Sequence, residues 1–118
     1  MIQGFNNFLY SFFLPTKFVR VYVSKGSGDK GRGVWIVRKS EIIGKTPEEI
    51  KDMLSLPQTP THVSDVKIPE GVKMRRGEAA QNKFGNGEGK QYEILKKKDE
   101  IPEEWFSNPR EIGDKFND

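Results

Sequence analysis

The sheet expected from the sequence is organised around Phe18-Val19-Arg20-Val21-Tyr22-Val23, a run of β-branched and aromatic residues that favours a strand. Successive side chains of a strand point to opposite faces, so Arg20 and Tyr22 share one face and the valines share the other. A charged residue in the middle of a strand lies either on a solvated face or beside a bound anion. The planar fork of arginine suits phosphate, and both interpretations of Arg20 stay open.

Outward from this strand, residues 24–33 form a basic, glycine-rich and flexible loop. Its backbone N–H groups could contact phosphate, but it lacks the Lys-Ser or Lys-Thr pair that closes a P-loop. A helix is expected from Thr46, because Thr46 can cap it, Pro47 suits its first position and Glu49 completes a capping box. Further strands are expected over 33–38, 62–68, 72–76 and 91–95.

The two ends of the chain have different character. Residues 1–16 are apolar and aromatic with helical spacing, which predicts an N-terminal arm or linker remnant that carries a helix. The tail is expected to turn at Asn108-Pro109-Arg110. Residues 17–118 then form a single α+β domain, with a small, strongly bent mixed or antiparallel sheet of about five short strands and one or two helices.

Composition limits the chemistry. The 118 residues carry a net charge of +3, which allows a phosphate-bearing partner without demanding one. No cysteine is present and there is one histidine, which excludes disulfides, thiol nucleophiles, cysteine-ligated metals and a two-histidine ribonuclease. No metal is expected. No apolar run is long enough to span a bilayer.

The strongest candidate for chemistry is Gln91-Tyr92-Glu93, which follows the glycine-rich loop 77–89. Gln91 and Glu93 point to one face of the expected strand. Glu93 could stabilise a cationic transition state while Gln91 orients a nucleophile. The alternative is an edge strand with its polar face in water. His62, the one imidazole, is either an acid or base or a structural residue.

Three segments resemble the ADP-ribosyltransferase-like domains at the C-termini of bacterial polymorphic toxins: Val19-Arg20-Val21-Tyr22, Ile68-Pro69-Glu70-Gly71-Val72 and Gln91-Tyr92-Glu93-Ile94-Leu95. The resemblance implies an ADP-ribosyltransferase-like fold that uses NAD as its substrate. Arg20 would hold the NAD phosphates and ribose, and Gln91 would orient the target group. Glu93 would stabilise the oxocarbenium-like transition state. The same interpretation places three aromatic residues against NAD: Tyr22, Trp35 and Tyr92.

A closer variant is similar to the tuberculosis necrotizing toxin type of NAD glycohydrolase, in which a glycine-rich loop ends in a Gln-Tyr pair like Phe84-Gly85-Asn86-Gly87-Glu88-Gly89-Lys90-Gln91-Tyr92. Water would then be the acceptor and free ADP-ribose the product. The segment 105–110 is similar to the tails of contact-dependent inhibition toxins. These resemblances imply a domain delivered from a larger secreted bacterial toxin into the cytoplasm of a target cell. Its partners would be an immunity protein and a protein or nucleic-acid target.

Two other functions stay open. A metal-independent ribonuclease toxin would use His62 as acid or base, with Lys90 and Arg75-Arg76 stabilising the phosphorane. A non-enzymatic interaction module would use residues 1–16 and Trp105-Phe106 as contact surfaces.

Overall fold

The computed structural model describes residues 2–6, for the course of the backbone, and residues 16–118 in full. These form a small α+β domain, as expected, with one α-helix and an antiparallel sheet. The strands are β1 Ile2–Asn6, β2 Phe18–Tyr22, β3 Trp35–Arg38, β4 His62–Val66, β5 Met74–Ala79, β6 Lys90–Ile94 and β7 Phe106–Glu111. The helix is α1 Pro47–Leu54, and short 3₁₀ turns cover η1 Lys39–Glu41, η2 Lys98–Glu100 and η3 Glu103–Trp105.

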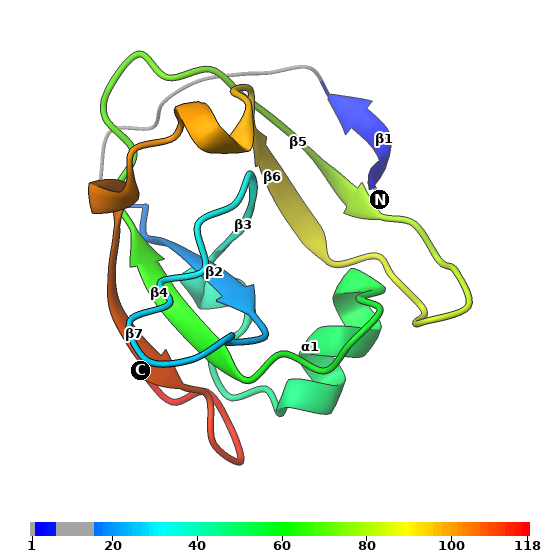
Figure 1. The fold of residues 1–118 in the computed structure, drawn as a ribbon. Helices are drawn as coiled ribbons and strands as arrows, with labels where there is room; N and C mark the ends of the chain where they lie inside the picture. The colour runs from blue at the N-terminus through cyan, green and yellow to red at the C-terminus, as the bar shows by residue number, and fades with distance from the viewer. Residues whose placement is uncertain (1, 7–15) are drawn as a thin grey trace.

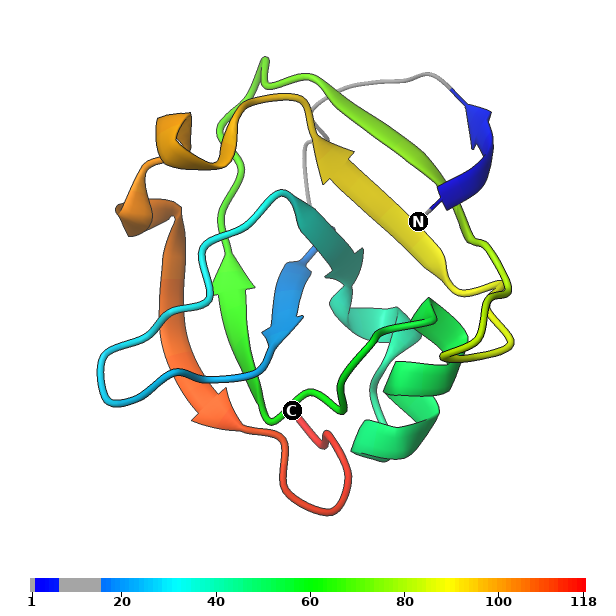
Figure 2. The same cartoon turned by 45° about the vertical axis from the view of Figure 1, so that its right-hand side comes forward.

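The strands lie in the order β1-β5-β6-β3-β2-β4-β7, and every neighbouring pair is antiparallel. Figures 1 and 2 show that β5 and β6 run obliquely to β4 and β7, so the sheet does not lie in one plane. The helix α1 lies beside the end of the sheet where β6 begins.

The helix forms for the reason that its sequence predicts. The Thr46 hydroxyl accepts a hydrogen bond from the Glu49 backbone N–H at 3.0 Å, and the Glu49 carboxylate accepts one from the Thr46 N–H at 2.8 Å. This capping box satisfies donors that the first turn leaves unpaired. The helix ends at Leu54, where Ser55 adopts a left-handed conformation with φ of 53°.

Hydrophobic side chains form two clusters, as the alternation along the strands requires. One cluster lies between the sheet and α1. It combines alternate residues of β2, β3 and β4 with residues of α1, of the segment before it and of the C-terminal tail: Val19, Val21, Val37, Ile42, Ile50, Leu54, Val63, Ile112 and Phe116. The other takes the residues in between: Phe18, Ile36, Val66, Met74, Tyr92, Ile94, Ile101 and Phe106. We call the side of the sheet that carries the first cluster the α1 face, and the other side the Tyr92 face.

The N-terminal expectation is wrong for residues 2–6, which form a strand on β5 and not a helix. Helical spacing of apolar residues is a local signal, and the free edge of β5 supplies backbone partners that such a signal does not include. The rest of the expected arm, Met1 and residues 7–15, lies outside the described residues. No helix in the described part of the chain has the length and apolar character to cross a bilayer.

The tail also differs from the expectation. Asn108-Pro109-Arg110 lies inside β7 and not in a turn, with Asn108 at φ 53° where the pairing with β4 shifts its register. Pro109 is tolerated because β7 is an edge strand. Phe106 is fully buried and Trp105 packs against its cluster. Phe106 therefore belongs to the core and does not form the contact surface expected for an interaction module, whereas Trp105 is partly buried at the margin of that core.

Candidate functional site

The strand β6 carries the residues that the sequence singles out, and it lies between β5 and β3. The alternative of a solvated edge strand is therefore wrong. Glu93 stands opposite Arg75 on β5 and opposite Trp35 on β3. Residues directly opposite each other share a face, so Arg75, Glu93 and Trp35 lie together on the α1 face with Gln91. We call these four residues the β6 site.

Glu93 is held in place by Arg75. Its Oε1 atom accepts hydrogen bonds from Arg75 Nε at 3.2 Å and from Arg75 Nη2 at 2.7 Å. Both side chains retain exposure, 37% for Arg75 and 21% for Glu93, so the ion pair borders solvent. Because both contacts use Oε1, the second oxygen of Glu93 takes part in neither of them. Arg75 thus belongs to the β6 site, whereas the sequence suggests it only as a phosphorane-stabilising group of a ribonuclease.

Gln91 is buried, and it faces Gly77 on the neighbouring strand. Its Oε1 atom has no hydrogen-bond partner among the residues that the structure describes. A buried carbonyl oxygen without a partner destabilises a fold by about 1–3 kcal/mol, so it requires an explanation such as a bound water or a ligand donor.

Tyr92 points to the opposite side of the strand. Its ring packs edge-on against Phe18 with ring centroids 5.1 Å apart, and the Arg38 guanidinium lies 5.3 Å from its centroid. Tyr92 is 2% exposed. The structure thus makes Tyr92 a core residue with almost no surface to offer to NAD.

Arg20 lies on the Tyr92 face, on the other side of the sheet from Glu93. Its Nε donates to the Gly31 carbonyl at 2.7 Å and its Nη1 donates to the Trp35 carbonyl at 2.9 Å. Burial lowers the pKa of Arg20 from its ordinary value, while the charge of Asp29 acts in the opposite direction. The guanidinium thus fastens the loop to the start of β3, a structural role that differs from both interpretations of the sequence.

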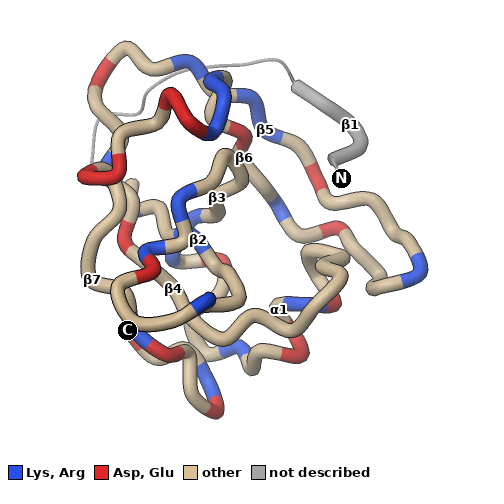
Figure 3. Tube along the Cα trace, in the orientation of Figure 1, with Lys and Arg blue, Asp and Glu red and all other residues tan. Residues whose placement is uncertain are grey.

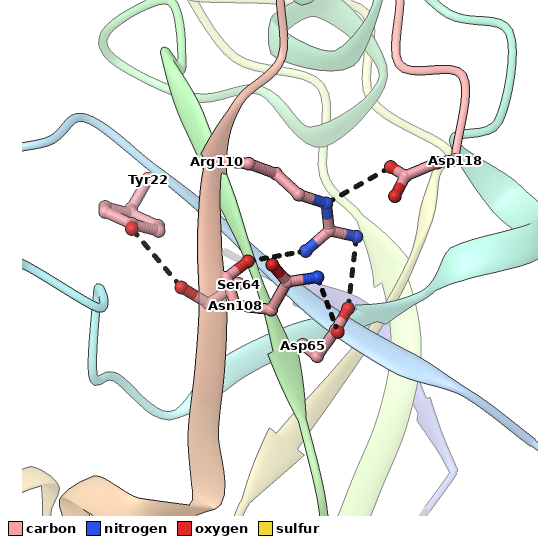
Figure 4. A network of polar contacts seen from close by, with 6 residues as sticks. All are labelled: Tyr22, Ser64, Asp65, Asn108, Arg110 and Asp118. Atoms are coloured by element: carbon pink, nitrogen blue, oxygen red, sulfur yellow. Dashed lines mark hydrogen bonds and ion pairs between the residues drawn. The ribbon is translucent and has the colours of Figure 1, made fainter.

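Hydrogen bonds to Asp29 fasten part of the loop 24–33, whose expected flexibility stays a prediction. The Asp29 carboxylate accepts hydrogen bonds from the Lys25 N–H at 2.9 Å and from the Gly31 N–H at 2.8 Å. The Tyr22 hydroxyl donates to the Asp29 carbonyl at 2.8 Å. The same hydroxyl accepts a hydrogen bond from the Ser64 hydroxyl at 3.2 Å (Figure 4). The Tyr22 hydroxyl therefore links the loop to the sheet.

The carboxylate of Asp29 makes the order of this loop depend on pH. Hydrogen bonds from the Lys25 and Gly31 backbone N–H groups lower its pKa below the usual range. A carboxyl group whose pKa is lower in the folded state contributes stability above its unfolded pKa and loses it as pH falls through the folded one. We expect the protection factor of the Gly31 amide, which compares its exchange rate with the intrinsic rate at the same pH, to fall below about pH 4. An Asp29→Asn variant should show a lower protection factor already at neutral pH. A pronounced loss of protection at Gly31 between pH 8 and pH 6 would contradict this cause.

His62 lies far from the β6 site. It stands opposite Tyr22 with ring centroids 5.9 Å apart, and its Nδ1 lies 2.8 Å from the Thr61 hydroxyl. Its strand β4 is separated from β6 by β2 and β3. Of the residues that the sequence assigns to chemistry, the structure brings Gln91, Glu93 and Trp35 together; it places Arg20, Tyr22 and His62 on the other face.

The glycine-rich loop before β6 is docked on the end of α1. The Gly87 N–H donates to the Asp52 carbonyl at 2.9 Å, and the Gly89 N–H donates to the Met53 carbonyl at 2.9 Å. The Asp52 carboxylate also accepts from the Asn86 N–H at 3.0 Å. These bonds satisfy carbonyls that the last turn of a helix leaves unpaired. Alternating glycines were the sequence signal for this docking, because each lets two backbones approach closely.

Outside the β6 site, Arg110 joins β7 to β4 and to the end of the chain through ion pairs. Arg110 makes ion pairs at 3.1 Å with Asp65 and with Asp118, and donates to the Asn108 carbonyl at 2.7 Å (Figure 4). Figure 3 shows basic and acidic segments interspersed along the trace. A dedicated nucleic-acid binder would instead show one strongly basic face.

Comparisons of the chain with protein-family models, with curated proteins and with solved structures gave no match.

Proposed function

We propose that this domain consumes NAD, and that the β6 site breaks the bond between nicotinamide and ribose. One observation carries the proposal: a fixed carboxylate, Glu93, shares a strand face with the buried Gln91, whose Oε1 has no partner among the described residues. Trp35 stands opposite Glu93 and adds an aromatic surface beside the carboxylate. An ADP-ribosyltransferase-like arrangement of the sheet is part of this proposal.

The chemistry requires a group such as Glu93. When the C1′–N bond of the nicotinamide ribose breaks, both of its electrons leave with the nicotinamide ring, which becomes neutral. Positive charge then develops on the ribose. A carboxylate that is already oriented stabilises this charge without reorganising, and fixed electrostatic groups of this kind contribute about 10²–10³ in rate. Arg75 supplies that orientation through its two hydrogen bonds to Oε1.

Gln91 acts on the acceptor. Its carbonyl oxygen can accept a hydrogen bond from the attacking O–H or N–H group, which would satisfy the buried atom. If water attacks C1′, its oxygen forms the new bond, its proton passes to solvent and the product is ADP-ribose. If a protein or nucleic-acid group attacks, that target becomes ADP-ribosylated. Both outcomes release nicotinamide.

The biological setting follows from the toxin resemblance. We propose a toxin domain of a larger secreted bacterial protein that acts in the cytoplasm of a competing cell and is inhibited by an immunity protein. A ribonuclease toxin is the second candidate, but its residues are dispersed: His62 is on β4, Arg75 is paired with Glu93 on the α1 face, and Lys90 is on β6. The geometry therefore supports NAD cleavage better.

The proposal predicts that purified protein releases nicotinamide from NAD, and that Glu93→Gln lowers this rate by about 10² or more because the carboxylate charge is lost. Glutamine keeps an oxygen for Arg75, so the variant should stay folded. Nicotinamide is quantified chromatographically, with and without cell extract as a source of acceptors.

The matched control is Glu78→Gln, which removes an exposed carboxylate from the neighbouring strand β5. It should retain the wild-type rate, and His62→Ala should be nearly silent. If the wild type never releases nicotinamide, or if Glu93→Gln is as active as Glu78→Gln, the proposal is wrong. Cleavage of RNA that needs His62 and ignores Glu93 would establish the ribonuclease instead.

A further inference from the structure

A hollow lined by cationic side chains lies where β2 begins and β3 ends. It has a volume of about 390 Å³ and is lined by Thr16, Lys17, Arg38, Lys39, Ser40 and Ile43. Small-molecule sites commonly measure about 300–1,000 Å³, so the hollow is large enough for a small ligand. We call it the cationic hollow.

The charged side chains in the described lining of this hollow are all cationic. Among the described residues it contains three cationic side chains and two hydroxyls, and no carboxylate. An adjoining hollow shares Ser40 and Ile43 but includes both signs of charge, with Lys45 beside Glu41 and Glu88. Only the first hollow therefore offers an anion a uniformly favourable field. Ile43, which is 45% exposed, adds an apolar wall.

The fold holds these cations near one another. Arg38 stands opposite Phe18 in the β2–β3 pair, and its guanidinium lies 5.3 Å from the ring centroid of the buried Tyr92. The Lys39 N–H donates to the Lys17 carbonyl at 2.9 Å, which ties together the two segments that carry the lysines. A prearranged group of cations lowers the cost of ordering side chains when a ligand binds.

We propose that the cationic hollow binds the phosphate group of a small organic phosphate. Guanidinium and ammonium groups are the usual phosphate partners, and the hydroxyls of Thr16 and Ser40 can donate to the remaining oxygens. The apolar wall at Ile43 receives the organic part. By strand parity Arg38 belongs to the Tyr92 face, whereas Glu93 belongs to the α1 face, so this site is distinct from the β6 site.

The test uses the full chain and measures thermal stabilisation and calorimetric binding, with AMP as the probe. Inorganic phosphate tests the free anion, and adenosine tests the uncharged moiety. We expect saturable binding of AMP, competition by inorganic phosphate and no binding of adenosine. A ligand that binds only the folded state raises the melting temperature by mass action. If inorganic phosphate binds as tightly as AMP, the proposal of an organic phosphate is overturned, because the wall at Ile43 then contributes nothing to binding.

The decisive variant is Lys17→Ala/Lys39→Ala, which should weaken AMP binding about tenfold or more, because charge-assisted hydrogen bonds are lost. Lys73→Ala/Lys96→Ala removes the same charge at exposed positions outside the hollow and should bind AMP as the wild type does. The milder Lys39→Gln serves if the double variant unfolds, and should also weaken binding.

The proposal is overturned if AMP and phosphate do not bind saturably, or if both double variants weaken binding equally. It is also overturned if a single-stranded oligoribonucleotide binds while AMP does not, since the site would then belong to a nucleic-acid surface. Nicotinamide release plays no part in these measurements, so a failure here is distinguishable from a failure of the NAD proposal.

Discussion

The variant Gly87→Ala is expected to lower the free energy of unfolding by about 3 kcal/mol, because it combines a strained backbone with a backbone collision. Gly87 has φ of 77°, and a Cβ atom there would lie 2.5 Å from the Ala79 carbonyl oxygen and 2.8 Å from the carbonyl carbon of Ala80. Neither neighbour is the end of a flexible side chain. The loop would have to move away from the end of β5, which would also disturb the hydrogen bond from the Gly87 N–H to the Asp52 carbonyl. Urea unfolding followed by circular dichroism measures the change.

Gly71→Ala separates the two causes. Gly71 also has positive φ, at 92°, but a Cβ atom there would meet nothing within 4 Å. We expect this variant to lower the free energy of unfolding by only about 1 kcal/mol. The converse change, Glu88→Gly, should raise it by about 1 kcal/mol, because Glu88 has φ of 77° without being glycine. Equal effects of Gly87→Ala and Gly71→Ala would show that Gly87 is not packed against the backbone at the end of β5.

Phe116→Ala is the second substitution with a large expected effect, about 3–5 kcal/mol of stability, since it opens a cavity in the core. Phe116 is 1% exposed and belongs to the cluster between the sheet and α1. Its backbone also pairs with the segment before α1: the Gly44 N–H donates to its carbonyl at 2.6 Å, and its own N–H donates to the Lys45 carbonyl at 2.9 Å. The tail would lose the side chain that anchors it, while these backbone bonds would remain possible.

Phe84→Ala is the matched control for Phe116→Ala. Phe84 is 36% exposed and lies between the Lys51 and Lys83 ammonium groups, 5.9 and 5.2 Å from its ring centroid. Its removal should change the free energy of unfolding by less than about 1 kcal/mol. If thermal and urea unfolding rank the two variants in the opposite order, the tail does not complete the core as described.

The candidate site was partly visible in the sequence. The alternation of a strand requires that Gln91 and Glu93 share a face, and the structure confirms that they do. That Arg75 and Trp35 meet Glu93 could not be deduced, because the register of two strands distant in sequence depends on how the whole sheet pairs. Arg20 shows the same limit: its carbonyl partners come from the loop that folds back over it.

Considered locally, the glycines of this chain predict flexible loops. In the structure, Gly33 passes so close to Arg20 that a Cβ atom would lie 2.5 Å from the guanidinium carbon, and Gly85 and Gly89 touch the backbone of α1 in the same manner. A residue without a side chain permits either motion or close contact. Which of the two occurs depends on what packs against it, and that is a tertiary property.

The sequence by itself determined the elements whose signals are local. Thr46, Pro47 and Glu49 determined where the helix begins, and alternating β-branched residues determined the strands around 18–22 and 62–66. Only the tertiary structure decided that residues 2–6 and 106–111 are strands, since their hydrogen bonds come from the edges of β5 and β4. It likewise decided which face of β6 meets Arg75 and which enters the core. The physical reason is that capping and alternation act between neighbours in the chain, whereas edge pairing, register and burial arise only when distant segments meet.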